Sequence, residues 1–201
     1  MSKNNKIDTL ANFFYEIGNL RKVLRAHQQT LLAHDPTDNI ASHSFRCALI
    51  GYFLAKELKA DSDKVLKMCL LHDIEEIRSG DMNWLNKKYV KVFETEIRED
   101  QLKNLPHNKE FLELSEEYNQ RKTKEAKIAK DADLLDQVLL LKEYAWQGNN
   151  EAKLWLHEGK RNDKCQQIKL MHFNLTKKIA EKAKSQKPSD WWKNAWTSKR
   201  R

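Results

Sequence analysis

A continuous apolar stretch that ends in two metal-binding side chains constrains this chain more than any other feature. The stretch is Cys69-Leu70-Leu71, and together with Val65, Leu66 and Met68 it places apolar side chains on nearly every side of a helix, which is typical of a central, buried helix. His72 and Asp73 follow it directly, and Glu75 and Glu76 come next. A buried carboxylate must be paired, hydrogen-bonded or bound to a metal, because its desolvation alone costs many kcal/mol. The sequence therefore predicts a hydrogen-bonded pair or a divalent-metal site at this point.

The rest of the chain is expected to be helical as well. Its 201 residues include only 5 Gly and 3 Pro, while Leu, Lys, Glu and Ala are abundant, so long helices joined by short polar turns are favoured. This length suits one domain that closes its own hydrophobic core. We therefore expect an all-α, single-domain helical bundle.

Apolar residues at spacings of three and four predict where the helices lie. We expect helices over 8–25, from 38–42 to 59, from 62 to about 80, and over 92–104, 110–119, 123–145, 149–159 and 163–184. Residues 26–38 and 80–91 are expected to be loops. Ser62 is the expected N-cap of the third helix, Gly51 is expected to let a neighbour approach closely, and Gly80 is expected to end the third segment.

The net charge of +8 is concentrated at the C-terminal end. Residues 177–201 carry nine Lys or Arg against two acidic residues, a balance of +7 that leaves +1 for residues 1–176. We interpret 1–176 as the domain and 177–201 as a basic, tryptophan-containing tail. A solvated terminal helix explains such a tail better than phosphate binding does, so nucleic acid is not an expected partner.

Cysteine use and hydropathy bear on the compartment. Cys47, Cys69 and Cys165 are far apart and odd in number, which favours buried free thiols in a reducing compartment over a disulfide framework. No apolar run approaches the ~20 residues that span a bilayer, and the N-terminus has no signal-like segment. We expect a cytoplasmic protein without a membrane partner.

Further metal ligands are expected on other helices, because two side chains on one helix rarely complete a site. His43 lies in the first turn of the preceding helix, and Asp133 is flanked by small alanines that permit close helix packing. Glu76 is four residues beyond His72 and three beyond Asp73, so on one continuous helix it faces their side. Imidazole and carboxylate ligands suit Mn²⁺, Co²⁺, Fe²⁺ or Zn²⁺.

Three ordered segments resemble a known family, the HD-domain metal-dependent phosphohydrolases, whose signature is a His, an adjacent His-Asp pair and a distant Asp. They are DNIASHSFRCALI around His43, LLHDIEEIRSGD around His72 and Asp73, and EEYNQRKTKEAKIAKDADLLD around Asp133. The likeness covers roughly residues 15–145 and is greatest to the small 5′-deoxynucleotidase branch.

The resemblance implies a role for each matching residue. It implies that His43, His72, Asp73 and Asp133 hold one divalent metal ion, with Asp131 and Asp136 as rivals of Asp133. It also implies that Glu76 is the catalytic carboxylate and that Asp81 contacts the substrate sugar or orients water. Arg25 resembles the arginine that grips the 5′-phosphate, with Arg21 and Arg46 as alternatives. Relatives place a tryptophan shortly after that arginine, where this chain has Ala26, His27, Gln28 and Gln29.

The expected function is hydrolysis of nucleoside 5′-monophosphates, with deoxyribose preferred, to nucleoside and phosphate. One alternative keeps the site and cleaves deoxynucleoside triphosphates to nucleoside and triphosphate. The other is a nucleic-acid-associated binding protein in which the site only senses a ligand. We also expect a homodimer, since the chain is helical with apolar ends.

Overall fold

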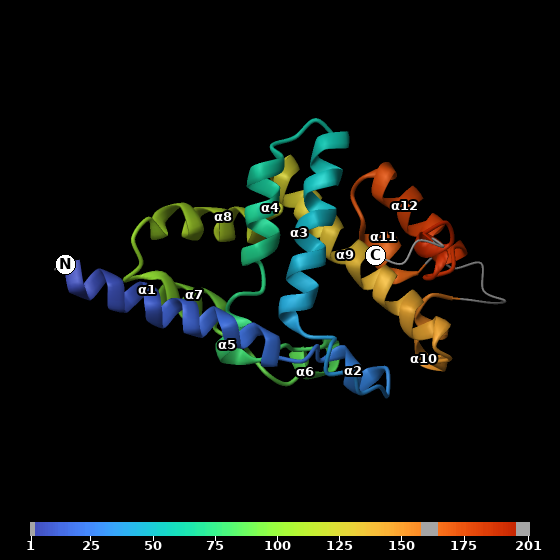
Figure 1. Cartoon of the computed structure of the whole chain (residues 1–201), viewed down its shortest axis with the longest axis horizontal. Coiled ribbons are helices and arrows are strands. Elements are labelled where there is room, and N and C mark those ends of the chain that lie inside the picture. The colour runs from blue at the N-terminus through green and yellow to red at the C-terminus, as the bar shows by residue number, and fades with distance from the viewer. Residues whose placement is uncertain (1–2, 158–164, 196–201) are drawn as a thin grey trace.

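The computed structural model describes residues 3–157 and 165–195, and within these ranges the fold is all-α (Figure 1). Its longest helices are α3 (Ile40–Glu57) and α9 (Lys124–Trp146). The described residues contain no strand, and their one isolated bridge joins Leu24 to Asn39. The predicted fold class is confirmed.

The centre of the fold is a packing of α3, α4 (Ser62–Leu71) and α9. Cys47 of α3, Met68 of α4 and Ala132 of α9 are completely buried. Gly51 lets α3 approach α4, because a Cβ at this position would lie 2.7 Å from the sulfur of Cys69. The expected close approach at Gly51 is confirmed, and it brings the start of α3 toward the end of α4.

The N-terminal segment differs from its prediction in its boundaries. Helix α1 spans Lys3–Ile17 and continues as a 3-10 turn, η1 (Gly18–Lys22), so the helix begins and ends earlier than expected. The predicted loop that follows contains a short helix, α2 (His27–Thr30). The chain then enters α3 at Ile40, where the side chain of Asn39 accepts a hydrogen bond from the Ser42 amide.

Four further helices lie between α4 and α9 in the sequence. They are α5 (Glu76–Ser79), α6 (Trp84–Lys87), α7 (Glu94–Leu102) and α8 (Asn108–Gln120). Gly80 ends α5 with a φ of 76°, as the sequence indicated. Helix α5 is tied to α1 by an ion pair between Arg78 and Glu16.

Helices α10 (Asn150–Trp155), α11 (Gln166–Leu170) and α12 (Asn174–Ser185) pack along the second half of α9 (Figure 1). The predicted helix over 163–184 is interrupted at residues 171–173, where the buried Asp131 carboxylate accepts hydrogen bonds from the backbone amides of His172 and Phe173. Helix α12 runs through the proposed domain boundary at residue 176, and Thr176 and Ala180 are completely buried.

The C-terminal tail is described as far as residue 195. It contains a 3-10 turn, η2 (Asp190–Trp192), in which Trp191 and Trp192 are exposed; Trp196 lies outside the described residues. The three cysteines are buried and free. None of the described helices combines the length and the hydropathy that a bilayer crossing requires.

Candidate active site

Helix α4 buries Val65, Met68, Cys69 and Leu71 but exposes Leu70, so it is less completely buried than the sequence predicted. It ends at Leu71, one residue before the predicted site. Asp61 caps its N-terminus by accepting hydrogen bonds from the amides of Asp63 and Lys64, so the expected cap at Ser62 is wrong by one residue. His72 is the C-cap residue, and Glu76 begins the separate helix α5. The expected continuous helix through Glu76 is therefore wrong; turns between α4 and α5 place Asp73 and Glu76 in the same cleft.

The imidazoles of His43 and His72 face each other with their Nε2 atoms 3.1 Å apart. Each Nδ1 atom is already engaged: that of His43 lies 2.7 Å from an Asp136 oxygen, and that of His72 lies 2.7 Å from the Cys69 carbonyl oxygen. Histidine ligands of metals usually donate their second N–H to such an acceptor, which fixes the ring and its tautomer. The remaining nitrogens of the two rings, both Nε2, thus point at one common position.

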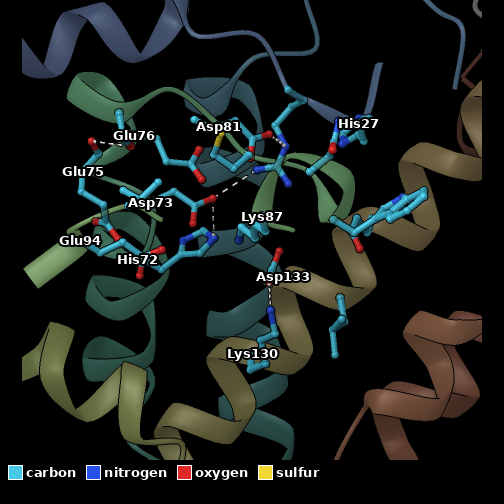
Figure 2. Close-up of a pocket in the computed structure, with 18 of the residues that line it drawn as sticks. His27, His72, Asp73, Glu75, Glu76, Asp81, Lys87, Glu94, Lys130 and Asp133 are labelled. Carbon is cyan, nitrogen blue, oxygen red and sulfur yellow. Dashed lines mark hydrogen bonds and ion pairs between the residues drawn. The ribbon is translucent and has the colours of Figure 1, made fainter. Parts of the chain in front are cut away.

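Two carboxylates complete this convergence. An Asp73 oxygen lies 3.1 Å from Nε2 of His72 and 3.5 Å from Nε2 of His43, and an Asp133 oxygen lies 3.5 Å from the same His43 atom. Figure 2 shows His72 and Asp73 together at the end of α4, with Asp133 facing them from α9. The other Asp133 oxygen accepts a hydrogen bond from Lys130 at 2.6 Å.

Neighbouring charges shift the pKa values of the groups in this cluster. Burial and the charge of Arg25 oppose protonation of His43, but hydrogen bonds to Asp136 and Asp73 raise its pKa to about 9. Burial also opposes protonation of His72, while Asp73 raises its pKa to about 9. Burial likewise opposes ionisation of Asp133, but Lys130 and the two imidazoles hold the pKa of its carboxyl below the usual range.

The donor set fits a divalent metal ion. Ligand atoms of His43, His72 and Asp73 all lie within 4.8 Å of one another, and Asp133 adds a fourth ligand atom, an oxygen, beside them. Two neutral imidazoles and two carboxylates would balance the charge of such an ion, whereas without it the buried carboxylates depend on protons held by the imidazoles. The cluster thus has the composition of a metal site.

Arg25 lies beside this cluster, between Asp73 and Asp81. Its terminal nitrogen donates a hydrogen bond to Asp73 at 3.2 Å, and its Nε lies 3.4 Å from an Asp81 oxygen that also accepts from the Ala26 amide at 2.7 Å. Arg25 is buried and lines the cleft. Asp81 therefore orients the turn that carries Arg25, in addition to lining the cleft itself.

Glu76 also lines the cleft, and its Oε2 atom is buried without a hydrogen-bond partner. Burial is the largest cause that raises the pKa of its carboxyl, and the negative charges of Asp73 and Asp81 raise it further, to about 11. A half-buried carboxyl with an unpaired oxygen beside a candidate metal site is a typical setting for acid–base chemistry.

The cleft that these groups face has a volume of 560 Å³. Its lining joins the end of α4, α5 and α6 to α9, α10 and α11. Figure 2 labels side chains of the first four of these segments, among them Asp73, Glu76, Lys87 and Asp133. Tyr118 lines the cleft from α8, and its ring contacts the His72 ring. The Arg121 guanidinium lies over the Tyr118 ring, 3.3 Å from the ring centre. This volume is in the range of small-molecule sites.

Arg46, an expected phosphate ligand, is engaged elsewhere. Its guanidinium donates hydrogen bonds to Oδ1 and to the backbone carbonyl of Asp136, and to a Glu143 oxygen at 2.7 Å. It lines a second hollow of 630 Å³ and not the cleft. Asp136, considered only as a rival ligand, instead links Arg46 to Nδ1 of His43.

His27 lies where the two hollows adjoin, and its Nε2 is 2.8 Å from an Asp38 oxygen that also accepts from the Tyr144 hydroxyl. Three further cleft residues, Lys87, Lys130 and Gln137, carried no sequence signal, because a polar residue on a helix reveals its direction only when the neighbouring helices are known.

A family model described as HD domain matches residues 17–172. The 5′-deoxynucleotidase HDDC2 of Mus musculus is 26% identical over 150 residues, which cover 72% of this chain and 74% of the relative. The same enzyme of Homo sapiens is 27% identical over 141 residues, covering 68% of each chain.

Solved structures show the same fold. A conserved hypothetical protein of Pyrococcus furiosus matches with a TM-score of 0.71 and 25% identity, over 88% of this chain and 99% of that one. A predicted metal-dependent phosphohydrolase of Magnetospirillum magnetotacticum matches with a TM-score of 0.67 and 22% identity, over 91% and 93% of the two chains.

Proposed function

The chain belongs to the HD domain family, and we propose that it is a metal-dependent phosphohydrolase whose substrates are nucleoside 5′-monophosphates, with deoxyribose preferred, which it cleaves to nucleoside and phosphate. The observation that carries this proposal is the placement of Arg25 and the unpaired carboxyl of Glu76 in one cleft beside the histidine–aspartate cluster. The 5′-deoxynucleotidase name of the relatives, at 26% and 27% identity, supports the choice of substrate.

We assign the metal to His43, His72, Asp73 and Asp133. When bound, a divalent cation supplies Lewis acidity, which acidifies water and polarises a phosphoryl oxygen. The mixture of imidazole and carboxylate ligands favours Mn²⁺, Co²⁺, Fe²⁺ or Zn²⁺.

Arg25 would bind the substrate phosphate. Its guanidinium is buried against Asp73 and Asp81 and faces the cleft, so it can offer two parallel N–H groups to a phosphate without first being desolvated. The hydrogen bond from Ala26 to Asp81 keeps this turn in place. Asp81 would also contact the sugar through its second oxygen.

Glu76 would accept a proton from the attacking water. Its carboxyl is held neutral by burial and by the negative charges of Asp73 and Asp81. A cation held by Asp73 would offset one of these causes, so the pKa of the Glu76 carboxyl would fall toward the range in which a carboxylate can act as a base. Glu76 then carries the acid–base step while Arg25 balances the phosphate charge.

The test is a panel of nucleoside mono- and triphosphates incubated with the Mn²⁺-loaded protein. Free phosphate from the monophosphates supports the proposal. Release of inorganic triphosphate from deoxynucleoside triphosphates would replace it with the alternative substrate, and tight binding of DNA or RNA with no turnover would replace it with a binding role. Asp73→Ala is expected to lose both metal and activity, whereas Glu76→Ala is expected to keep the metal and lose turnover.

The assembly is a separate part of the proposal. We expect a homodimer, whose mass can be measured by light scattering.

A further inference from the structure

One side of the cleft carries a set of side chains that the proposed chemistry does not use. This set, the α9–α11 wall, consists of Leu134 and Gln137 of α9, Trp155 of α10, and Gln167 and Leu170 of α11. Gln137 is four residues beyond Asp133, so it lies one helical turn from the candidate metal ligand on the same side of α9. The wall is therefore continuous with the phosphate end of the cleft.

The polar groups of this wall are available to a ligand. Gln137 makes no side-chain hydrogen bond within the described part of the chain, although it lines the cleft and is half-buried. The carbonyl oxygen of Gln167 accepts a hydrogen bond from the Cys165 thiol at 2.8 Å, which leaves its amide hydrogens free for the cleft. Together the two amides offer both donors and an acceptor.

The remaining groups of the wall are flat or apolar. Trp155 is half-buried and Leu134 is buried, and both line the cleft beside the two glutamines. The opposite side of the cleft is charged instead, with Glu76, Asp81 and Lys87. A planar heterocycle with polar edges binds more favourably to the α9–α11 wall than to the charged side, because it can stack on the indole while the amides hydrogen-bond its edge.

The wall is held firmly enough to select a ligand. Asn149 caps α10 by accepting from the Ala152 amide and also donates to the Leu31 carbonyl at 2.8 Å. Ala152 of α10 is completely buried against residues of α9, and Ile168 of α11 is buried in the same core. Trp155 and Gln167 therefore project from helices whose other faces are packed.

We propose that the α9–α11 wall is the nucleobase subsite of the cleft, in which Trp155 stacks on the base and Gln137 and Gln167 hydrogen-bond its edge. This inference rests on the proposed nucleotide substrate. It adds that the protein recognises the base itself, beyond the sugar and phosphate.

The experiment compares a nucleotide with the same phosphate lacking a base. The ratio of kcat/KM for thymidine 5′-monophosphate to kcat/KM for 2-deoxyribose 5-phosphate is measured for the Mn²⁺-loaded wild type, Gln137→Ala and Trp155→Ala. Each variant is expected to lower this ratio about tenfold, since hydrogen bonds and base stacking each contribute at that level. Gln166→Ala and Trp146→Ala are matched controls, because both side chains are exposed and lie outside the cleft lining.

Calorimetric binding of thymidine, which has no phosphate, provides a readout that requires no turnover. Weaker binding by Gln137→Ala and Trp155→Ala than by the controls supports the subsite. An unchanged kinetic ratio in both variants, or no thymidine binding by the wild type, would overturn it. If the wild type releases phosphate from neither substrate, the proposed reaction fails, and the thymidine measurement still decides whether the wall binds a base.

Discussion

Replacing Asp136 by Asn should weaken metal binding although Asp136 is not an assigned ligand. Its oxygen lies 2.7 Å from Nδ1 of His43, and the residue is only 3% exposed, so water cannot take over this contact. Partners of metal-binding histidines typically contribute 10- to 100-fold in affinity. We expect a loss in that range, equivalent to about 1.4 to 2.7 kcal/mol.

The pH of the measurement decides whether this loss is visible. Asp136 helps to raise the pKa of His43 to about 9, so at neutral pH the wild type must release a proton before metal binds. Displacing that proton at about pH 7 costs on the order of 3 kcal/mol. Asp136→Asn removes much of this cost, which offsets the weaker ligand. The full loss of metal affinity should therefore appear only above the pKa of His43, at about pH 9.5.

The assay is an anaerobic Mn²⁺ titration by calorimetry at about pH 7 and about pH 9.5. Glu143→Gln is the control, because Glu143 shares Arg46 with Asp136 but does not contact His43. A deficit that grows from the lower to the higher pH in Asp136→Asn alone supports the reasoning. Wild-type affinity of Asp136→Asn at the higher pH, or an equal loss in Glu143→Gln, would refute it.

Three other predictions address catalysis, the dependence of stability on pH, and core packing. Glu76→Gln should bind Mn²⁺ like the wild type but lower kcat by about 10² to 10⁴, measured as phosphate release; wild-type turnover would exclude Glu76 as the base. Because the pKa values of the two site imidazoles are raised to about 9, the stability that they contribute to the metal-free protein should be fully present at about pH 6.5 and be lost as pH rises through about 9; urea unfolding at several pH values between these limits checks this, and a rise in stability over that range would contradict it. Gly51→Ala should cost about 1 to 3 kcal/mol, because the new Cβ would lie 2.7 Å from the Cys69 sulfur; thermal unfolding should show a lower midpoint than in Gly18→Ala, whose Cβ meets nothing within 4 Å, and equal midpoints would show that the core adjusts freely.

The long helices and the order of the motifs could be predicted from the sequence. The apolar periodicity located α3 and α9 to within a few residues, and scarce Gly and Pro indicated the all-α class. The pattern of His43, the His72–Asp73 pair and Asp133 identified groups that the structure brings together. The helices depend on local spacing, which a sequence displays directly, whereas the four site residues were identified through the resemblance of their motifs to a known family.

Features that depend on tertiary contacts could not be predicted in the same way. Asp131, Asp133 and Asp136 are similar in sequence, but Asp131 binds the chain between α11 and α12, Asp133 faces His43, and Asp136 supports the opposite nitrogen of that ring. The end of α4 before His72 was equally hidden, because the apolar pattern continues to Ile74, which is also buried. Only the packing of distant helices distinguishes these roles.

The central claim is that four side chains from α3, α9 and the end of α4 hold one divalent ion. Anomalous diffraction at the manganese edge, from crystals of the Mn²⁺-loaded protein, tests it most directly. We predict one strong peak in contact with Nε2 of His43, Nε2 of His72 and carboxylate oxygens of Asp73 and Asp133. An empty cluster at saturating Mn²⁺, or an ion bound without His43 and Asp133, would contradict the account.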